Sequence, residues 1–364
     1  MTRRSASTGR WTGSSRCCPL KTRPVCRSQN PRSSNEPLAQ GSPASCTAAV
    51  PGRERKSRQA GRPDVTKLLV LGAGGQVGWE LVRSLQPLGE VVACDRRRAD
   101  LSEPATLGAL VADVKPAVVV NAAAYTAVDR AEQEFDLAQT VNGVAPGILA
   151  QAARSAGALF VHYSTDYVFD GSGHEPRKES APVAPVNAYG RSKRAGEERV
   201  AAAGGDWLVL RTSWVYAARG QNFVRTMLRL AAERESLRVV DDQVGAPTSA
   251  RLIADASAQL IRQALDERSR GSFGSELLHL CAAGETSWHG FAAAILEGWR
   301  ELAGADSLKL RELAAIPTRD YPTPAARPLN SRLDCTRLEE RYDLRLPDWR
   351  AGLMLVLAEL ARKD

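Results

Sequence analysis

From residue 67 onward, short apolar runs alternate with helix-forming stretches, and this alternation constrains the fold more than any other feature of the chain. Five apolar runs are predicted strands: 67–71, 91–94, 117–121, 158–164 and 207–211. The stretches between them are predicted helices: 76–86, 104–112, 131–155, which Pro146 should bend or divide, and 187–203. Continuous apolar runs are typical of parallel strands buried on both faces. The pattern therefore predicts an α/β fold, a doubly wound parallel sheet of the Rossmann type.

The remainder of the chain predicts a smaller C-terminal lobe. Helices are predicted over 223–234, 249–264 and 349–360, and short strands over 237–240 and 277–280. The proline-rich segment 316–334 is expected to be an ordered loop over a site, because apolar elements flank it. We expect a disordered basic extension over 1–64, a mainly dinucleotide-binding domain over 65–245, and a mainly substrate-binding lobe with a closing helix over 246–364.

The basic character of the chain is confined to its first segment. The 364 residues carry a net charge of +8, yet residues 1–64 hold 13 Lys and Arg against three acids, and the rest holds 36 basic and 38 acidic residues. A near-neutral body argues against nucleic-acid binding. The extension lacks apolar periodicity, so disorder is expected. It could be an organelle transit peptide, a basic interaction arm, or translated sequence upstream of the true start, which we favour.

Cysteine and histidine usage predicts a reducing compartment and no zinc site. Four cysteines lie in the extension and three are scattered over the body, with no metal-ligand spacing. The four histidines are expected to be packing or surface residues. No apolar stretch is long enough for a secretory signal or a membrane span. We therefore expect a cytoplasmic protein that does not bind membranes.

A glycine-rich loop follows the first predicted strand and opens a helix. Gly72, Gly75 and Gly78 have the spacing G-x-x-G-x-x-G in the string LVLGAGGQVGWEL. Glycine permits a tight turn, lets backbone approach a pyrophosphate, and lets the helix pack closely on the strand. Amides at the helix start would bind the phosphates. The loop thus indicates a nicotinamide dinucleotide cofactor.

The end of the second predicted strand leaves the choice between NAD(H) and NADP(H) open. Asp95 follows Gly78 at the position where a carboxylate binds the adenosine ribose hydroxyls of NAD. The next residues, Arg96, Arg97 and Arg98, could instead hold the 2′-phosphate of NADP, or could simply be a solvated loop. Asp100 and Leu101 are expected near the adenine. Asn121, Ala122, Ala123 and Ala124 end the third strand with small side chains, which leave room for the cofactor or reflect ordinary close packing.

Three residues with acid–base chemistry follow in a suitable order. Tyr189 and Lys193 are four residues apart on one predicted helix, so they share a face. An ammonium beside a phenol favours the phenolate, so we expect the pKa of Tyr189 to be lowered by about 3, about 4 kcal/mol of differential stabilisation. Thr165 ends the fourth strand at the edge where doubly wound sheets bind ligands, and its hydroxyl could bond a carbonyl oxygen as charge develops there. Together these groups predict hydride and proton transfer to a carbonyl.

At this point the chain resembles the extended short-chain dehydrogenase/reductases, and within them the dTDP-4-dehydrorhamnose reductases. The matching strings cover nearly all of 67–364 in the family's order: GAGGQVGWEL, NAAAYTAVDRAE, HYSTDYVFDG, APVNAYGRSK, RTSWVYA, NFVRTMLRLA, DQVGAPTSA and ARPLNSRLD. The extension before Val65 has no counterpart in the family, so nothing about it is implied.

The resemblance implies a role for each matching residue. For the cofactor, it implies Gly75, Gln76 and Val77 at the pyrophosphate, Asp95, Asp100 and Leu101 at the adenosine half, and Ala122, Ala123, Ala124 and Tyr163 along its path. Tyr189 would donate the proton and Lys193 would support it while holding the nicotinamide ribose. For the sugar, it implies Thr165, Asp166 and Trp214. Asp166 could instead be a turn carboxylate and Trp214 a core aromatic. In the proline-rich loop with Asn330, Arg327 could pair with the diphosphate or form a structural ion pair.

The implied reaction is the reduction of the 4-keto group of dTDP-4-dehydro-β-L-rhamnose to dTDP-β-L-rhamnose, a step in cell-envelope carbohydrate synthesis. Two alternatives stay open: a reductase or epimerase for another nucleotide-sugar, and a non-catalytic regulatory subunit of methionine adenosyltransferase. Some relatives dimerise through a magnesium ion held by carboxylates, but the matching ligands are not apparent in this sequence. A magnesium ion and the choice between monomer and homodimer therefore stay open.

Overall fold

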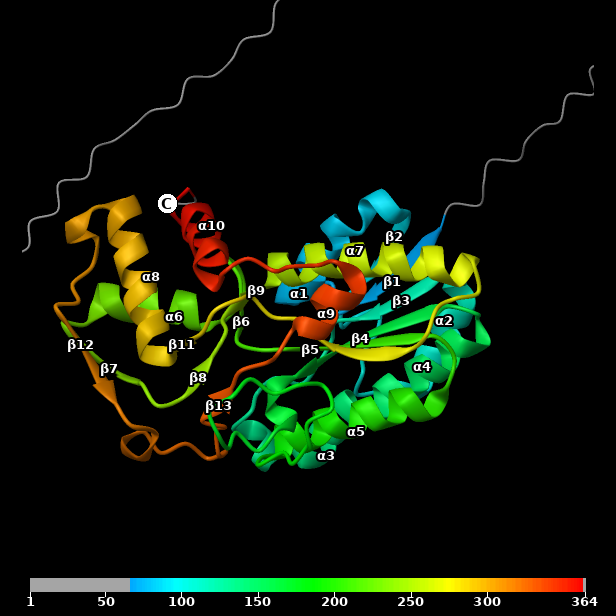
Figure 1. Ribbon diagram of the computed structural model, residues 1–364, viewed down its shortest axis with the longest axis horizontal. Coiled ribbons are helices and arrows are strands. Elements are labelled where there is room, and N and C mark those ends of the chain that lie inside the picture. The colour runs from blue at the N-terminus through cyan, green and yellow to red at the C-terminus, as the bar shows by residue number, and fades with distance from the viewer. Residues whose placement is uncertain (1–65, 363–364) are drawn as a thin grey trace, which may run out of the picture. The chain divides into compact units, whose positions relative to one another are not determined.

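A six-stranded parallel sheet forms the centre of the described chain, residues 66–362 of the computed structural model (Figure 1). The disorder and the alternative origins predicted for residues 1–64 concern a segment outside these residues. The strand order is β10-β5-β4-β3-β1-β2. The strands are β1 (Lys67–Leu71), β2 (Glu90–Cys94), β3 (Val118–Asn121), β4 (Leu159–Thr165), β5 (Trp207–Thr212) and β10 (Glu276–His279). Because β1 lies between β2 and β3, the chain reverses direction across the sheet there, which is where such folds bind ligands.

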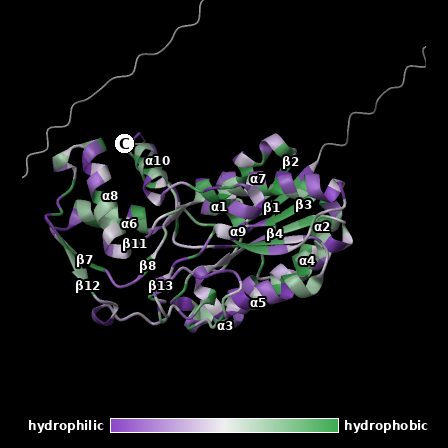
Figure 2. Cartoon of the chain, in the orientation of Figure 1, coloured by the Kyte–Doolittle hydropathy of each residue, from purple (hydrophilic) through white to green (hydrophobic). Residues whose placement is uncertain are grey.

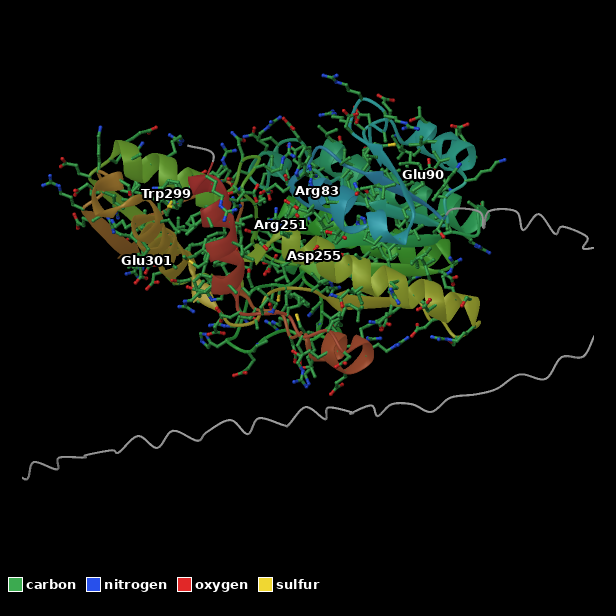
Figure 3. All side chains as sticks on the ribbon, turned by 90° about the horizontal axis from the view of Figure 1, so that it is seen from above. Arg83, Glu90, Arg251, Asp255, Trp299 and Glu301 are labelled. Carbon is green, nitrogen blue, oxygen red and sulfur yellow. The ribbon has the colours of Figure 1, made fainter. Side chains whose placement is uncertain are left out.

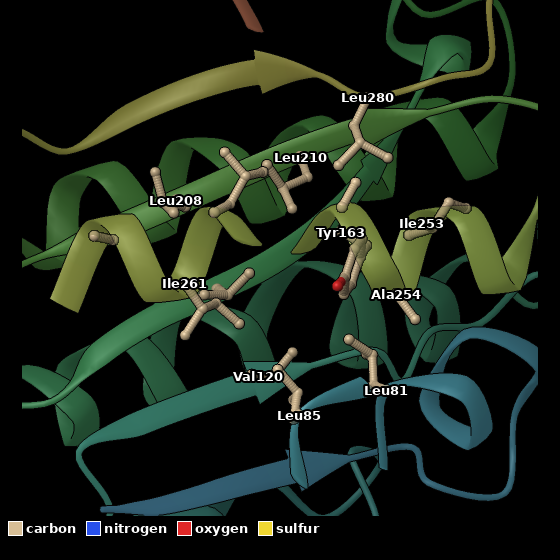
Figure 4. Packing of buried hydrophobic residues seen from close by; sticks show 14 of the residues in the cluster. Leu81, Leu85, Val120, Tyr163, Leu208, Leu210, Ile253, Ala254, Ile261 and Leu280 are labelled. Carbon is tan, nitrogen blue, oxygen red and sulfur yellow. The ribbon is translucent and has the colours of Figure 1, made fainter. Parts of the chain in front are cut away.

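Helices cover both faces of the sheet, as the strand sequences require. Helices α1 (Gln76–Ser84) and α7 (Ala250–Ser269) pack on one face, and α2 (Leu107–Val114), α4 (Ala145–Ser155) and α5 (Ala188–Ala203) pack on the other. Alternate residues of each strand join one or the other apolar cluster. Figure 2 accordingly colours the strands as hydrophobic, and Figure 4 shows Leu81, Val120 and Ile261 packed in the cluster under α1 and α7. The predicted doubly wound α/β sheet is confirmed.

The stretch predicted as one long helix is divided where Pro146 predicts a break. A 3-10 turn (Arg130–Glu132), helix α3 (Phe135–Gln139), a π turn (Thr140–Val144) and α4 follow one another. Pro146 lies in the first turn of α4 and has no N–H to donate to the carbonyl four residues earlier, that of Asn142. A Cβ on Gly196 of α5 would lie 2.2 Å from this carbonyl oxygen. The break therefore lets α5 approach the turn closely.

A second group of elements forms its own apolar cluster. Helices α6 (Phe223–Glu233), α8 (Trp288–Ala303) and α10 (Trp349–Ala361) pack together around Phe291 and Trp349. Strand β7 (Ser236–Val240) pairs in parallel with β12 (Glu312–Ile316). Three short strands form a small sheet: β8 (Val244–Gly245), β11 (Thr286–Ser287) and β13 (Asn330–Ser331). Two more, β6 (Val215–Tyr216) and β9 (Thr248–Ser249), pair with each other.

The two packed groups of elements are not separated by a single boundary between residues 245 and 246. Helix α6 and strand β7 pack with α8 and β12, although they precede the expected boundary. Helix α7, strand β10 and helix α9 (Thr336–Tyr342) follow it and pack with the sheet and its helices. In Figure 3, Arg251 and Asp255 of α7 lie beside Arg83 of α1, and Ser84 donates to Asp255 at 2.6 Å. The chain thus passes more than once between the sheet and the second cluster.

The expectations drawn from sequence lack helices α8 and α9, strand β12 and the two-residue strands β6, β8, β9, β11 and β13. The segment 316–334 is mostly irregular, as expected, apart from a 3-10 turn and β13. Cys281 and Cys335, expected to be scattered, have their sulfurs 3.5 Å apart as free thiols, and the Cys335 hydrogen bond and burial raise the pKa of Cys281. Within residues 66–362, none of the helices combines the length and the apolar character that crossing a bilayer requires.

Candidate active site

The site lies where β3 and β4 end and α5 begins. Thr165 is the last residue of β4, and Tyr189 lies in the first turn of α5. Asn187 caps α5 by accepting the Gly190 amide at 2.8 Å. A Cβ on Gly190 would lie 2.2 Å from the Tyr167 carbonyl oxygen, so only glycine lets α5 begin so close to the end of β4. The structure therefore brings Tyr189 beside Thr165.

The phenol of Tyr189 is held as a neutral acid. Its ring packs edge-on against that of Tyr167, with centroids 5.6 Å apart. Burial raises the pKa of Tyr189 to about 12, although the hydrogen bond with the Thr165 hydroxyl lowers it. The expectation of a lowered pKa is therefore wrong for the ligand-free chain. The reason is that the Lys193 side chain binds elsewhere, so burial dominates.

Lys193 is buried beneath the site, with 2 % of its surface exposed. Its Nζ donates to the Tyr163 carbonyl oxygen at 2.6 Å and lies 3.2 Å from Nε2 of His162. Burial lowers the pKa of Lys193 to about 8, and the carboxylate of Glu197 opposes this shift. Both Glu197 oxygens are already bound to Arg211, at 2.8 and 2.6 Å. Lys193 thus has no carboxylate partner of its own.

Thr165 and Asp166 form the polar edge on which a substrate could lie. The Thr165 hydroxyl donates to Asp166 Oδ1 at 3.0 Å and accepts from the Tyr167 amide at 3.2 Å. The second carboxyl oxygen of Asp166 has no hydrogen-bond partner among the described residues. Burial raises the pKa of Asp166 to about 6. Asp166 is therefore not satisfied as a turn carboxylate alone.

The glycine loop forms a cradle that fits a dinucleotide pyrophosphate. Gly72 has φ +78°, and a Cβ on it would lie 2.6 Å from the Ala123 amide nitrogen. A Cβ on Gly78 would lie 2.1 Å from the Gly72 carbonyl oxygen, so α1 packs directly on the loop. No side chain caps α1, whereas side chains cap α5, α6 and α7. The first amides of α1 are left for an anionic ligand.

Residues expected at the adenosine half follow β2. Asp95 Oδ1 accepts the amides of Arg97 and Arg98, at 3.0 and 3.3 Å. Asp100 binds Ser102 and, at 3.1 Å, the guanidinium of Arg96; the Ser102 hydrogen bonds are the main reason why its pKa is lowered. Leu101 is buried in the cluster under α2 and α4. Asp95 and Asp100 therefore shape this loop in the ligand-free chain.

Five more residues that were expected to contact the cofactor lie near the glycine loop or at the ends of β3 and β4. Ala122 and Ala123 lie against Gly72. Val77 packs on the apolar cluster under α1. Gln76 Oε1 accepts from Asn222 at 2.9 Å, which links α1 to the start of α6. The Tyr163 side chain lies in the apolar cluster beside α7 (Figure 4), where its phenol donates to Ser257 at 2.7 Å. Its backbone carbonyl accepts from Lys193.

Residues expected near the nucleotide-sugar lie in the loops around β8 and β13. Trp214 has φ +47° and stacks on Trp288 of α8, with centroids 3.6 Å apart. Arg327 pairs with Asp129 at 2.8 Å, which is the structural ion pair left open by the sequence. The Asn330 amide donates to the carbonyls of Ser172 and Glu175. The structure therefore places Arg327 and Asn330 in internal contacts of the loop.

Sequence reasoning did not single out His162, Asn222 or Trp288. His162 lies in the string HYSTDY. Side chains alternate between the two faces of a strand, so His162 lies on the same face of β4 as Phe160, the face that packs on α5. Asn222 precedes a helical pattern and is a recognisable N-cap. No cluster of three or more His, Cys, Asp or Glu suited to a metal occurs in the described part of the chain.

Known proteins resemble this chain over almost its whole described length. A family model described as the RmlD substrate binding domain matches residues 66–362. A dTDP-4-dehydrorhamnose reductase of Burkholderia thailandensis is 56% identical over 81% of this chain and 99% of that protein, and one of Salmonella typhimurium is 47% identical over 80% and 97%.

A solved structure agrees with these relatives. The dTDP-4-dehydrorhamnose reductase of Bacillus anthracis, in complex with NADP, superposes with a TM-score of 0.73 at 33% identity, over 81% of this chain and 99% of that one. The model match, the two relatives and this structure agree on one group of proteins. The chain belongs to the RmlD substrate-binding-domain family, together with the dTDP-4-dehydrorhamnose reductases.

Proposed function

We propose that the chain reduces the 4-keto group of dTDP-4-dehydro-β-L-rhamnose to dTDP-β-L-rhamnose, with a reduced nicotinamide dinucleotide as hydride donor. The observation that carries the proposal is the convergence of Thr165 and Tyr189 at the end of β4, with the buried Lys193 bonded to β4 and the glycine cradle at the end of β1 of the same sheet. Relatives at 56% and 47% identity are named for this activity.

The free thiols of Cys94, Cys281 and Cys335 suit a reducing compartment, and we place the enzyme in the cytoplasm.

Tyr189 is the proton donor in this proposal. A phenol whose pKa is about 12 carries its proton at neutral pH and can hydrogen-bond the substrate carbonyl as a neutral donor. When bound, the cofactor supplies the hydride for the carbonyl carbon. As charge develops on the carbonyl oxygen, Tyr189 transfers its proton, and the Thr165 hydroxyl turns its single proton from Asp166 to this oxygen. Lys193 holds the nicotinamide ribose and stabilises the phenolate that remains.

Either NADP(H) or NAD(H) fits the loop after β2. Asp95 keeps one carboxyl oxygen for the Arg97 and Arg98 amides, so Oδ2 is available to a ribose hydroxyl of NAD(H). The Arg97 and Arg98 side chains are exposed, and they can bind the 2′-phosphate of NADP(H). We propose that both cofactors are used and that Arg97→Ala/Arg98→Ala weakens NADPH binding by about tenfold or more while changing NADH binding little.

The second cluster serves as the substrate lobe in this proposal. Asp166 would accept hydrogen bonds from the sugar, and the Trp214 ring would lie against the nucleotide-sugar. To bind the diphosphate, Arg327 would have to break its ion pair with Asp129. In that case Asp129→Asn should change the affinity for the nucleotide-sugar, which a binding titration can measure.

The testing experiment is an absorbance assay of reduced nicotinamide with dTDP-4-dehydrorhamnose, run with each cofactor. We expect keto-sugar-dependent oxidation by the wild-type chain. A panel of UDP- and GDP-keto-sugars is the control, because a relative that acts on another nucleotide-sugar would prefer one of those. Cofactor binding without oxidation of either cofactor by any sugar would contradict the proposal.

A further inference from the structure

A chain of hydrogen bonds runs from the backbone of β3 to Lys193 through His162. Asn121 Oδ1 accepts the Ala123 amide at 3.1 Å, which orients the Asn121 amide group. Its Nδ2 therefore faces His162 Nδ1, at 3.2 Å. The other ring nitrogen, Nε2, lies 3.2 Å from Lys193 Nζ. Along the side chains of this network the direction of one bond sets the next, and a hydrogen bond with the Asn121 backbone raises the pKa of His162 against the larger effect of burial.

The backbone amide fixes the direction of every bond. Because Asn121 presents an N–H₂ to the ring, His162 Nδ1 must accept, and in a neutral imidazole the proton then lies on Nε2. Burial is the main cause that holds the pKa of His162 well below its usual range, so the ring stays neutral. Nε2–H is thus a donor, and Lys193 Nζ can match it only as an unprotonated amine with a lone pair.

The surroundings of Lys193 also favour the amine. An ammonium has three N–H donors, but the Tyr163 carbonyl is the only acceptor bonded to it among the described residues. Both oxygens of Glu197 are bound to Arg211. Other charged and titratable groups around this network come from α5, β4, β5, β10 and the turn after β4: Tyr189, His162, Arg211, His279 and Asp166. None offers a free carboxylate hydrogen bond to Lys193.

We propose that His162 is a positioning residue that donates Nε2–H to Lys193 and stabilises its neutral amine in the cofactor-free enzyme, so that cofactor binding is coupled to proton uptake. The proton joins Lys193 when ribose hydroxyl oxygens supply the acceptors that the ammonium lacks. The coupling rests on the proposed function, because it requires Lys193 to hold the nicotinamide ribose. The tautomer of His162 does not depend on that function.

The first experiment reads the His162 tautomer directly. The chain has four histidines, so ¹⁵N-histidine labelling gives a spectrum that is simple to assign by comparison with the His162→Gln variant. In the ligand-free protein we expect an unprotonated Nδ1 and a protonated Nε2 for His162. A proton on Nδ1 would overturn the proposal, because Nε2 would then accept a hydrogen bond from a Lys193 ammonium.

The second experiment measures proton uptake when NADPH binds. Calorimetry in buffers of different ionisation enthalpy, at about pH 9 and thus above the Lys193 pKa of about 8, should show uptake approaching one proton. Across higher pH, the affinity for NADPH should fall by up to about tenfold per pH unit. In His162→Leu no side-chain donor faces Lys193, so we expect a smaller proton uptake, and the alkaline loss of NADPH affinity should begin at higher pH.

His279→Leu is the matched control, because His279 is also fully buried, on β10, but its ring contacts the Asp334 backbone carbonyl instead of Lys193. It should retain the proton uptake of the wild type. Binding without uptake in the wild type, or an equal loss of uptake in both variants, would contradict the proposal. Failure to bind either nicotinamide cofactor would instead contradict the proposed function, and the tautomer spectrum would still decide the role of His162.

Discussion

At the scale of single residues, burial controls the chemistry of the site more than sequence spacing does. The i, i+4 spacing of Tyr189 and Lys193 suggested an ammonium acting on a phenol. In the structure the amine turns beneath the helix to a carbonyl of β4, and desolvation dominates both pKa values in opposite directions. Desolvation thus favours the neutral form of both the phenol and the amine.

Removing the Tyr189 hydroxyl should remove the proton donor and little else. We expect Tyr189→Phe to lower kcat by about 10²–10⁴-fold, the usual contribution of a general acid, with NADPH affinity within about threefold of wild type. Stopped-flow or steady-state oxidation of NADPH and a binding titration check the two parts. Turnover close to wild type would mean that another group protonates the sugar oxygen.

The buried carboxylate of Asp166 should lower the free energy of unfolding at neutral pH. Its carboxyl is buried, and its folded pKa of about 6 lies above the usual 3.8, so the stability it contributes at low pH is lost as pH rises through about 6. We therefore expect Asp166→Asn to be more stable than wild type at pH 7, by up to about 3 kcal/mol, and equal to it near pH 4. Urea unfolding at both pH values tests this, and an Asp166→Asn less stable at pH 7 would contradict it.

Breaking the buried ion pair between Arg211 of β5 and Glu197 of α5 should lower the free energy of unfolding far more than breaking an exposed pair. The exposed pair for comparison is Arg194 and Glu198, both on α5. The first pair has 4% and 8% of its side chains exposed, and the second has 41% and 61%. Arg211→Met leaves a buried carboxylate unpaired and should cost about 3–5 kcal/mol of unfolding free energy. Arg194→Met should cost less than about 1 kcal/mol. Equal losses in urea unfolding would refute the comparison.

At the scale of elements, some close approaches between backbone segments could be predicted from the sequence and others could not. Glycines at 72 and 78 stood out because a strand precedes and a helix follows them. The break at Pro146 was also predictable, but not that it would bring the Asn142 carbonyl against Gly196, because that contact joins segments 54 residues apart. Contacts of this kind depend on packing, which local sequence patterns do not contain.

Gly78→Ala should separate the helix from the loop. The added Cβ would lie 2.1 Å from the Gly72 carbonyl oxygen, so α1 must move and its free amides move with it. We expect NAD(P)H affinity to fall by more than about tenfold. Gly108→Ala on α2 is the control, since nothing lies within 4 Å of its Cβ, and it should stabilise the chain by about 0.5–1 kcal/mol without affecting binding. Unchanged affinity in Gly78→Ala would refute the role of the cradle.

At the scale of the whole described chain, the sequence predicted most of the sheet and its helices, and in the second cluster it predicted α6, β7 and α10 but not α8 or β12. Strands buried on both faces have a strong local signal. Strand β12 has none, because it exists through pairing with β7, far away in sequence. Helix α8 is different: Trp288, Phe291 and Ile295 repeat at helical spacing after the Ser287 cap, so the signal was present in the sequence.

The site could be predicted as a set of residue types but not as a network. Thr165, Tyr189 and Lys193 follow from order and spacing, whereas the contact of Lys193 with His162 depends on the pleat of β4 and on the depth at which α5 packs. Likewise, Trp214 could be noticed in sequence, but its stacking on Trp288 joins the ends of two distant elements.

Hydride transfer to C4 of the keto-sugar is the central claim, and isotopic labelling tests it most directly. The chain would be incubated with dTDP-4-dehydrorhamnose and NADPH carrying deuterium at the transferable position, and the product would be analysed by NMR. We expect dTDP-β-L-rhamnose with deuterium at C4 only, and none in the product mixture of Tyr189→Phe beyond its residual turnover. A sugar without deuterium, or with deuterium at another carbon, would contradict the proposed reaction.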